Sequence, residues 1–292
     1  MYSGASNKGH VDLITAAISR PRSQIGSFVQ RDLICPAYVV RWNVLCAPSG
    51  TRQKFSIDLF GSQVLVPFLF GLAEAGYAPD AVTDSVVEDL MSLQCADGSW
   101  NRGLATSRAP IQESNIARTA QALRALRLFG PPARQIEIEN RIAQAQAWLW
   151  KAQPRTCDDY AMLLGGFRWS GAKREKIEQA AQSLLAQQRS DGGWAGNPNL
   201  AGDAFSTGEA LYALHESGSV GVHDRAYKRG IEFLLRTQYD DGAWYVRSRA
   251  VKLMPYFESG FPFGDDQWIS AAGTAWASLA LAPAVEDRKM RR

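Results

Sequence analysis

A seven-residue motif, Gln-x-x-Asp-Gly-x-Trp, occurs three times in this chain, at Gln94–Trp100, Gln188–Trp194 and Gln238–Trp244. Asp-Gly is a strong turn signal, because glycine adopts a positive φ without a Cβ clash and aspartate accepts hydrogen bonds from the backbone that follows it. Each copy follows an apolar, leucine-rich segment and precedes another helical segment. The motif therefore predicts a helix end, a turn and a new helix, repeated along the chain.

The segments around the motifs have helical periodicity and are separated by glycine, proline and serine. Helices are expected at about residues 55–75, 80–94, 113–129, 136–153, 158–169, 173–188, 204–216, 223–238 and 267–281. Three of them carry a Thr-Ala-Leu pattern on one face, starting at Thr119, Thr207 and Thr274. These helices are rich in small residues and nearly uncharged; in Gly208–Leu214 the single charge is that of Glu209. They are expected to be buried inner helices, whereas their partners, which are charged on one face, are expected to lie outside.

Helix pairs that each contact only their neighbours form a solenoid, which closes on itself when it curves enough. The pattern therefore predicts an all-α fold, a single α/α toroid of about eleven or twelve helices in an inner and an outer layer. Residues 1–54 are expected to form an N-terminal helical segment that closes the toroid, and residues 55–283 to form the repeats. Residues 284–292 are expected to be a basic, solvated tail.

The charge and the cysteines limit the partners and the compartment. A formal net charge of +3 is too small to indicate a nucleic-acid partner. The four cysteines, Cys35, Cys46, Cys95 and Cys157, lie far apart, which favours free thiols in the cytoplasm over a disulfide scaffold. The N-terminal residues lack the pattern of a secretory signal, and the longest apolar stretch, 64–73, is about half of a membrane span. A soluble protein is expected, and peripheral contact with a membrane remains an alternative.

The three motif copies, set between alternating inner and outer helices, resemble the repeat of the squalene/hopene cyclase and protein prenyltransferase β-subunit superfamily. The resemblance covers about residues 55–283. In that superfamily the Gln and Trp of the motif tie successive helices together, and the resemblance implies the same structural role for Trp100, Trp194 and Trp244. Zinc-dependent prenyl transfer is not expected, because the Asp, Cys and His ligands of that branch have no counterpart set here. No metal site is therefore predicted.

The copy expected after Gln153 has lost Asp-Gly-x-Trp, and the chain there reads Thr-Cys-Asp-Asp-Tyr-Ala over residues 156–161. Protonating cyclases of the superfamily carry Asp-x-Asp-Asp-Thr-Ala at the start of an inner helix, where the middle Asp gives a proton to an alkene or epoxide. Laid on that pattern, Asp158 takes the place of the proton donor, Asp159 that of its neighbour, and Tyr160 replaces the Thr as a candidate substrate contact. Alternatively, the two aspartates form only the acidic N-terminus of a helix, which capping and the helix dipole favour.

The linker after the third motif copy is unusually long. From the motif Trp to the inner-helix Thr the chain runs 19 residues in the first copy, 13 in the second and 30 in the third. The extra residues, within 245–268, are aromatic and predict a lid over the central cavity that stabilises carbocations. The alternative is a loop packed over helix ends. The candidate substrate contacts are Tyr256, Phe257, Phe261, Phe263, Asp265, Asp266 and Trp268.

Arg247 and Arg249 share one face of this linker and are candidates, with Lys252, for holding a diphosphate; a solvated surface is the other interpretation. The resemblance and Asp158 together imply a terpene-cyclase-like enzyme that cyclises a polyprenyl chain or a polyprenyl diphosphate by protonation. No cofactor is expected, except Mg²⁺ if the substrate is a diphosphate. The alternatives are a non-catalytic toroid that binds an apolar ligand or a partner protein, and a β-subunit-like half that needs an α-helical partner.

Overall fold

The computed structural model describes residues 62–101, 109–111, 114–250 and 258–290, and these residues form nine α-helices and no β-strand. Five helices make the inner layer: α5 (Ser62–Glu74), α7 (Asn115–Phe129), α9 (Cys157–Trp169), α11 (Ala204–Glu216) and α13 (Gln267–Met290). Four make the outer layer: α6 (Ala81–Ser92), α8 (Gln135–Leu149), α10 (Arg174–Leu185) and α12 (Arg225–Thr237). Two 3-10 turns, η2 (Pro132–Arg134) and η3 (Gly264–Asp266), precede α8 and α13. The chain has the all-α fold of an α/α toroid, as predicted.

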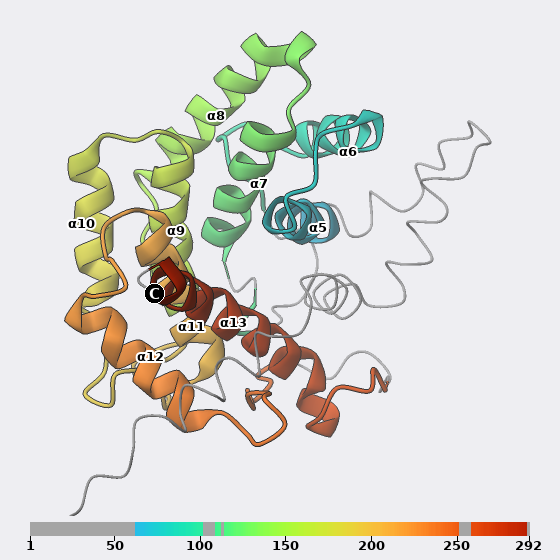
Figure 1. Cartoon of the computed structure of the whole chain (residues 1–292). Helices are drawn as coiled ribbons and strands as arrows, with labels where there is room; N and C mark the ends of the chain where they lie inside the picture. The colour runs from blue at the N-terminus through green and yellow to red at the C-terminus, as the bar shows by residue number, and fades with distance from the viewer. Residues whose placement is uncertain (1–61, 102–108, 112–113, 251–257, 291–292) are drawn as a thin grey trace, which may run out of the picture.

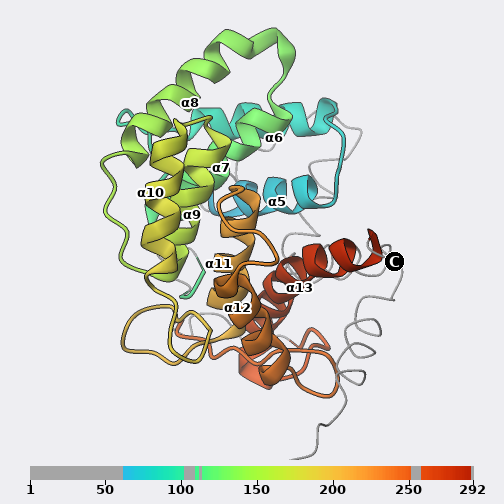
Figure 2. The same cartoon turned by 60° about the vertical axis from the view of Figure 1, so that its left-hand side comes forward.

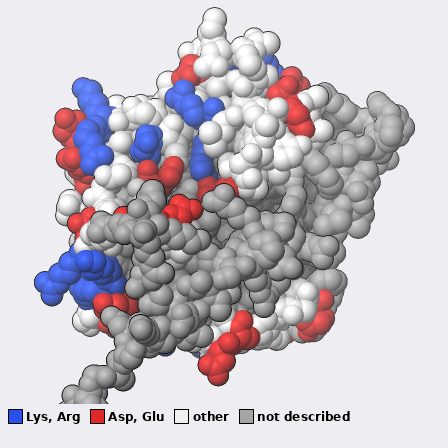
Figure 3. All heavy atoms as spheres, in the orientation of Figure 1, with Lys and Arg blue, Asp and Glu red and all other residues white. Residues whose placement is uncertain are grey.

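The inner helices pack on one another in chain order, α5 on α7, α7 on α9, α9 on α11 and α11 on α13 (Figures 1 and 2). The first and last of them also meet, because the rings of Phe70 on α5 and Trp276 on α13 lie 5.7 Å apart between their centres. On the outside, basic and acidic side chains are interspersed over the outer helices (Figure 3). The inner layer is thus enclosed and the outer layer faces solvent.

Helix starts follow the sequence closely because side chains cap them. The side chains of Asp80, Ser114, Thr156 and Asp203 each accept hydrogen bonds from the backbone of the turn that they precede. The expected bounds agree with the observed bounds within about four residues for the helices from α6 to α12. The number of helices in the whole toroid depends on residues 1–61, which lie outside the described part.

The prediction for the C-terminal end was wrong. Helix α13 does not stop at Leu281 but continues through Pro283 to Met290, so residues 284–290 are helical. By length and composition alone, the helical segment Gly264–Asp287 could cross a membrane. An 18-residue stretch of it has a mean hydropathy of 1.3, and 39% of that stretch is buried inside the structure. Core helices have the same composition, and Ile269 and Ala277 of α13 are fully buried here.

The motif acts as a brace between helices, as predicted for its tryptophans. In the second copy, Trp194 is buried, its Nε1 donates to Leu184 O on the preceding outer helix at 2.9 Å, and its backbone N donates to Thr207 Oγ1 on the following inner helix at 2.9 Å. Gln188 Nε2 donates to Ala226 O of the next outer helix at 2.8 Å. The tryptophans of the other two copies make the same two bonds, to Leu90 and Thr119 and to Leu234 and Thr274.

Candidate functional site

Asp159, in the copy that lost its tryptophan, is a structural acceptor at the start of α9. Its Oδ2 accepts from the backbone N of Arg155 at 2.9 Å and of Thr156 at 3.1 Å, while Thr156 Oγ1 accepts from Asp159 N. The hydroxyl of Ser114, the N-cap residue of α7, donates to Asp159 Oδ1. This is a capping box extended to the neighbouring inner helix, so the capping interpretation describes Asp159.

Asp158, the next residue back, points to a different neighbour. It is 6% exposed, and its carboxyl group interacts with that of Glu209 on α11, which is 1% exposed. Burial is the largest cause that raises the pKa of Glu209 well above its ordinary value, and the Asp158 carboxyl adds to it. Glu209 Oε2 is buried without a hydrogen-bond partner among the described residues. Glu209 therefore holds its proton more tightly than an exposed glutamate does.

A third inner-helix carboxylate lies beside this pair. Asp203 caps α11 by accepting from Ser206 N at 2.8 Å, and burial raises its pKa, while its hydrogen bonds to Ser206 and the positive charge of Arg249 act in the opposite direction. Asp203, Asp158 and Asp159 each contribute to the raised pKa of Glu209. The amino-terminal parts of α9 and α11 thus gather four carboxyl groups, an acidic cluster made of Asp158, Asp159, Asp203 and Glu209.

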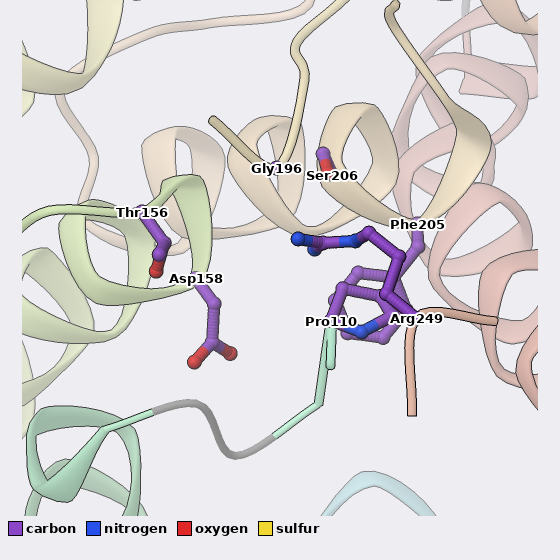
Figure 4. A pocket seen from close by; sticks show the side chains of 7 residues that line it. All are labelled: Pro110, Thr156, Asp158, Gly196, Phe205, Ser206 and Arg249. Carbon is purple, nitrogen blue, oxygen red and sulfur yellow. The ribbon is translucent and has the colours of Figure 1, made fainter. Parts of the chain in front are cut away.

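Asp158 and Arg249 line one narrow cavity next to this acidic cluster (Figure 4). Its other lining residues are Pro110, Thr156, Gly196, Phe205 and Ser206. The cavity is too narrow to admit a water-sized sphere, whereas typical ligand pockets have volumes of roughly 300–1,000 Å³. The guanidinium of Arg249 lies against Gly196, where a Cβ would meet Nη2 at 2.7 Å, so a larger residue at this position would displace the end of the Arg249 side chain.

The two long linkers of the chain meet at this cavity. Arg249 N, in the linker between Trp244 and α13, donates to Ala109 O, in the linker between Trp100 and α7, at 3.2 Å. The shorter linker of the second copy contributes Gly196 to the same wall. All three linkers between motif and inner helix therefore border the carboxyl group of Asp158.

Among the described residues of the third linker, Arg247, Phe263, Asp265 and Asp266 do not line the cavity beside Asp158. Phe263 packs its ring against the exposed rings of Tyr239 and Tyr245, at 5.1 and 5.4 Å, and Asp266 accepts from the hydroxyl of Tyr245 at 2.7 Å. Asp265 is exposed, as is Arg247. This part of the linker therefore packs over helix ends and does not line the cavity.

The remaining candidates are core residues or lie outside the described part. Phe261 is buried, and Tyr160 and Trp268 pack against the hydrophobic core. Tyr256, Phe257 and Lys252 fall in the segment 251–257, outside the described residues. Among the described residues, no group of three or more His, Cys, Asp or Glu side chains could hold a metal ion.

Sequence reasoning missed Glu209 and the aromatic residues of the lumen. The rings of Phe70, Trp169, Tyr212 and Trp276 converge from four inner helices, with centre distances of 5.2 Å between Tyr212 and Trp276 and 6.1 Å between Phe70 and Trp169. A signal existed for Glu209, because it is the single charge in an otherwise uncharged, small-residue stretch of an inner helix. A carboxylate on such an inner helix is expected to be buried, and a buried carboxylate either interacts with another polar group or takes part in function.

Comparisons with known proteins give partial matches. No family model matches this chain. It is 39% identical over 69 residues to a drimenyl diphosphate synthase of Streptantibioticus cattleyicolor, and 28% identical over 108 residues to lanosterol synthase ERG7 of Saccharomyces cerevisiae. These matches cover 24% and 37% of this chain. The two partial likenesses support a terpenoid cyclase-like superfamily. The matched segments span only 12% and 14% of the lengths of those two relatives.

A solved structure matches almost the whole chain. It is that of a possible member of the GH105 family from Klebsiella pneumoniae, with a TM-score of 0.50, 11% identity, and coverage of 99% of this chain and 96% of that one. At this identity the likeness shows the fold alone, the α/α toroid.

Proposed function

We propose that this chain is a terpene-cyclase-like enzyme that begins its reaction by protonating a carbon-carbon double bond or an epoxide of a polyprenyl substrate. The observation that carries the proposal is the pair of buried, interacting carboxyl groups of Asp158 and Glu209. Protonating an alkene requires a carboxylic acid that keeps its proton at neutral pH and a site that excludes water. A carboxyl pair in a buried setting provides such an acid, because both groups cannot ionise at little cost.

The residues of the acidic cluster then have separate roles. Asp158 lines the cavity and is the member that reaches a substrate, whereas Glu209 is not part of the lining and acts through its interaction with Asp158. The proton leaves the pair from Asp158, the π electrons form the new carbon-hydrogen bond, and the positive charge passes to the substrate as a carbocation. The final carbocation then loses a proton, so that the reaction consumes no proton overall and the product is neutral at carbon. Asp159, fixed by Ser114 and Thr156, holds the start of α9 in place.

The narrowness of the cavity favours one alternative function, that of a non-catalytic binding protein. It does not admit a water-sized sphere and so does not accommodate a polyprenyl chain as it stands; substrate entry therefore requires the linkers around Arg249 to separate. If they do not separate, the toroid is a non-catalytic protein that binds an apolar ligand or a partner protein.

Incubation of the full chain with a panel of polyprenols, polyprenyl diphosphates and squalene, followed by mass spectrometry of the products, tests the proposal. Asp158→Asn keeps the side-chain shape and removes the acidic proton, so product formation should fall by about a hundredfold or more. Glu209→Gln should also reduce it. The matched control is Asp240→Asn, at an exposed aspartate that precedes another aspartate in the third motif. Near-full turnover by Asp158→Asn would contradict the assignment, and no turnover of any substrate by the wild type would favour the non-catalytic toroid.

A further inference from the structure

The outer helix α8 differs from the other outer helices in the face that it turns to solvent. Helices α6, α10 and α12 each expose charged side chains, among them Glu88, Arg174 and Lys228. The exposed residues within α8 carry no charge; they are Gln135, Ile136, Asn140, Ala143, Gln144 and Ala147. Ile136 is 82% exposed, more than any other large hydrophobic residue that the structure describes, and Trp150, the C-cap residue of α8, is 54% exposed. Helix α8 therefore presents an uncharged, partly apolar surface to solvent.

The three charged residues of α8 lie on its flanks and form ion pairs within the fold. Glu137 pairs with Arg141 on the same helix at 2.8 Å and with Arg134 on η2 at 2.5 Å. Glu139 pairs with Arg127 on α7 at 2.5 Å. A solvated outer face normally carries such charges itself. Depletion of charged residues and the presence of tryptophan are instead typical of the centre of a protein–protein interface.

Five of the exposed residues lie along one line of the helix. Ile136, Ala143 and Trp150 follow one another at intervals of seven residues, which is close to two turns, and Asn140 and Ala147 lie beside that line. We call these five residues the α8 face. Helix α8 packs mainly on α7 and α9 on its inner side. In Figures 1 and 2 no other described helix lies beyond it on the outer side, so the α8 face is accessible along its length.

We propose that the α8 face is the contact surface of a homodimer, in which the α8 helices of two copies lie antiparallel about a two-fold axis at Ala143. An interface with two-fold symmetry must be self-complementary. The α8 face meets this condition, because Ile136 and Trp150 are equally far from Ala143, so that Ile136 of each copy lies opposite Trp150 of the other. The alanines in the middle allow the two helix axes to approach closely. Because the α8 face carries no charge, it has no group that would select nucleic acid or an anionic membrane surface.

The size of the α8 face sets the expected strength of the dimer. Helix α8 has 15 residues, so the contact is about 22 Å long and about 10 Å wide. A contact of this size is at the low end of specific interfaces, and a dissociation constant in the micromolar range is expected. The inference does not depend on the proposed cyclase activity, because it uses no residue of the acidic cluster or of the cavity that Asp158 lines.

Sedimentation velocity of the full chain, between about 1 and 200 μM, tests the proposal. The average mass should rise with concentration from that of one 32.1 kDa chain toward twice that value. Ile136→Glu and Trp150→Lys should each raise the dissociation constant of the dimer at least about tenfold, because each places a charge against an apolar side chain at both ends of the contact. The matched control is Gln182→Glu, at an exposed residue of α10, which should dimerise like the wild type. Circular dichroism of each variant shows that the fold is retained.

A mixture of the Ile136→Glu chain and the Trp150→Lys chain tests the antiparallel arrangement. In a dimer of one copy of each, the introduced glutamate lies opposite the introduced lysine at one end, and the original isoleucine and tryptophan meet at the other. The mixture should therefore associate more tightly than either variant alone.

Four results would overturn the proposal. The wild type could stay monomeric over the whole concentration range, Ile136→Glu could leave the dimer intact, or the mixture could associate no better than its separate components. The fourth is a monomeric wild type that binds phosphatidylcholine vesicles while Ile136→Glu does not, which would assign the α8 face to a lipid surface.

Discussion

Asp158 on α9 and Glu209 on α11 place two buried carboxyl groups together between neighbouring inner helices, and the Asp158 carboxyl adds to burial in raising the pKa of Glu209. Ionisation of either carboxyl group therefore affects the protonation of the other. Folding brings the two groups together, and the unfolded chain separates them. The stability of the protein should therefore depend on pH through this pair.

Glu209→Gln should flatten that dependence. The pKa of Glu209 is raised above its ordinary value of 4.5 by burial and by Asp158, so above this pH the folded chain holds a proton that the unfolded chain has lost. The free energy of unfolding consequently falls as the pH rises from 4.5 through the folded-state pKa. Glutamine keeps the shape and cannot titrate. Urea unfolding between about pH 5 and pH 8 should show a smaller slope for the variant, and identical slopes would contradict the role of Glu209.

Asp159→Asn should destabilise the fold more than Asp158→Asn does. Asp159 accepts from two backbone N–H groups and a hydroxyl, and an asparagine amide offers only one acceptor atom for them. The expected cost is about 1–2 kcal/mol. Chemical denaturation measures the free energy of unfolding of both variants. A larger decrease for Asp158→Asn than for Asp159→Asn would contradict the prediction.

Trp194→Ala should cost about 3–4 kcal/mol, because the indole is fully buried and its removal leaves a cavity and removes one hydrogen bond to the Leu184 carbonyl. The matched control is Trp150→Ala, at a tryptophan that is 54% exposed, where a loss below about 1 kcal/mol is expected. Thermal melts that shift equally for both variants would show that the motif tryptophan is not a brace.

The braces were predictable from sequence because their chemistry is local. Gly98, Gly192 and Gly242 have φ values of +92°, +94° and +86°, as the Asp-Gly turn requires, and a tryptophan two residues later reaches back to the helix just ended. Most helix starts were predictable for the same reason, because the residue that caps each helix immediately precedes it in the sequence. The end of α13 was missed because Pro283 was expected to lie beyond the helix, whereas the helix runs through it.

The site was predictable only in part, because it depends on which inner helices become neighbours. The fold brings Asp158 next to Glu209, 51 positions later in the chain, and no spacing rule connects the two. The aromatic residues of the third linker drew attention by composition, yet Phe263 packs with Tyr239 and Tyr245 at the surface. The lumen is filled instead by single aromatic residues from separate helices, such as Phe70 and Trp276.

The ion pair of Arg124 and Glu74 should be the strongest polar coupling in that lumen. Both side chains are largely buried, at 11% and 18% exposed, and the guanidinium is stacked on two rings. Arg124→Met leaves the largely buried Glu74 carboxylate without its cation, with the hydroxyl of Tyr212 still donating to it at 2.7 Å, so a loss of about 3 kcal/mol is expected. Glu74→Gln in the same chain removes the orphaned charge and should restore at least about 1 kcal/mol, since the cost lies in the unpaired group more than in the lost attraction.

A double-mutant cycle on these two positions should therefore give a coupling above about 1 kcal/mol. The exposed pair of Arg174 and Glu178 on α10, at 2.8 Å and more than half exposed, is the matched control and should couple by less than about 0.5 kcal/mol. Urea unfolding of the four chains in each cycle measures both values. If the lumen pair coupled no more strongly than the surface pair, Arg124 would be held by its ring contacts alone, and the carboxylate of Glu74 would have no part in stabilising a cation in this part of the lumen.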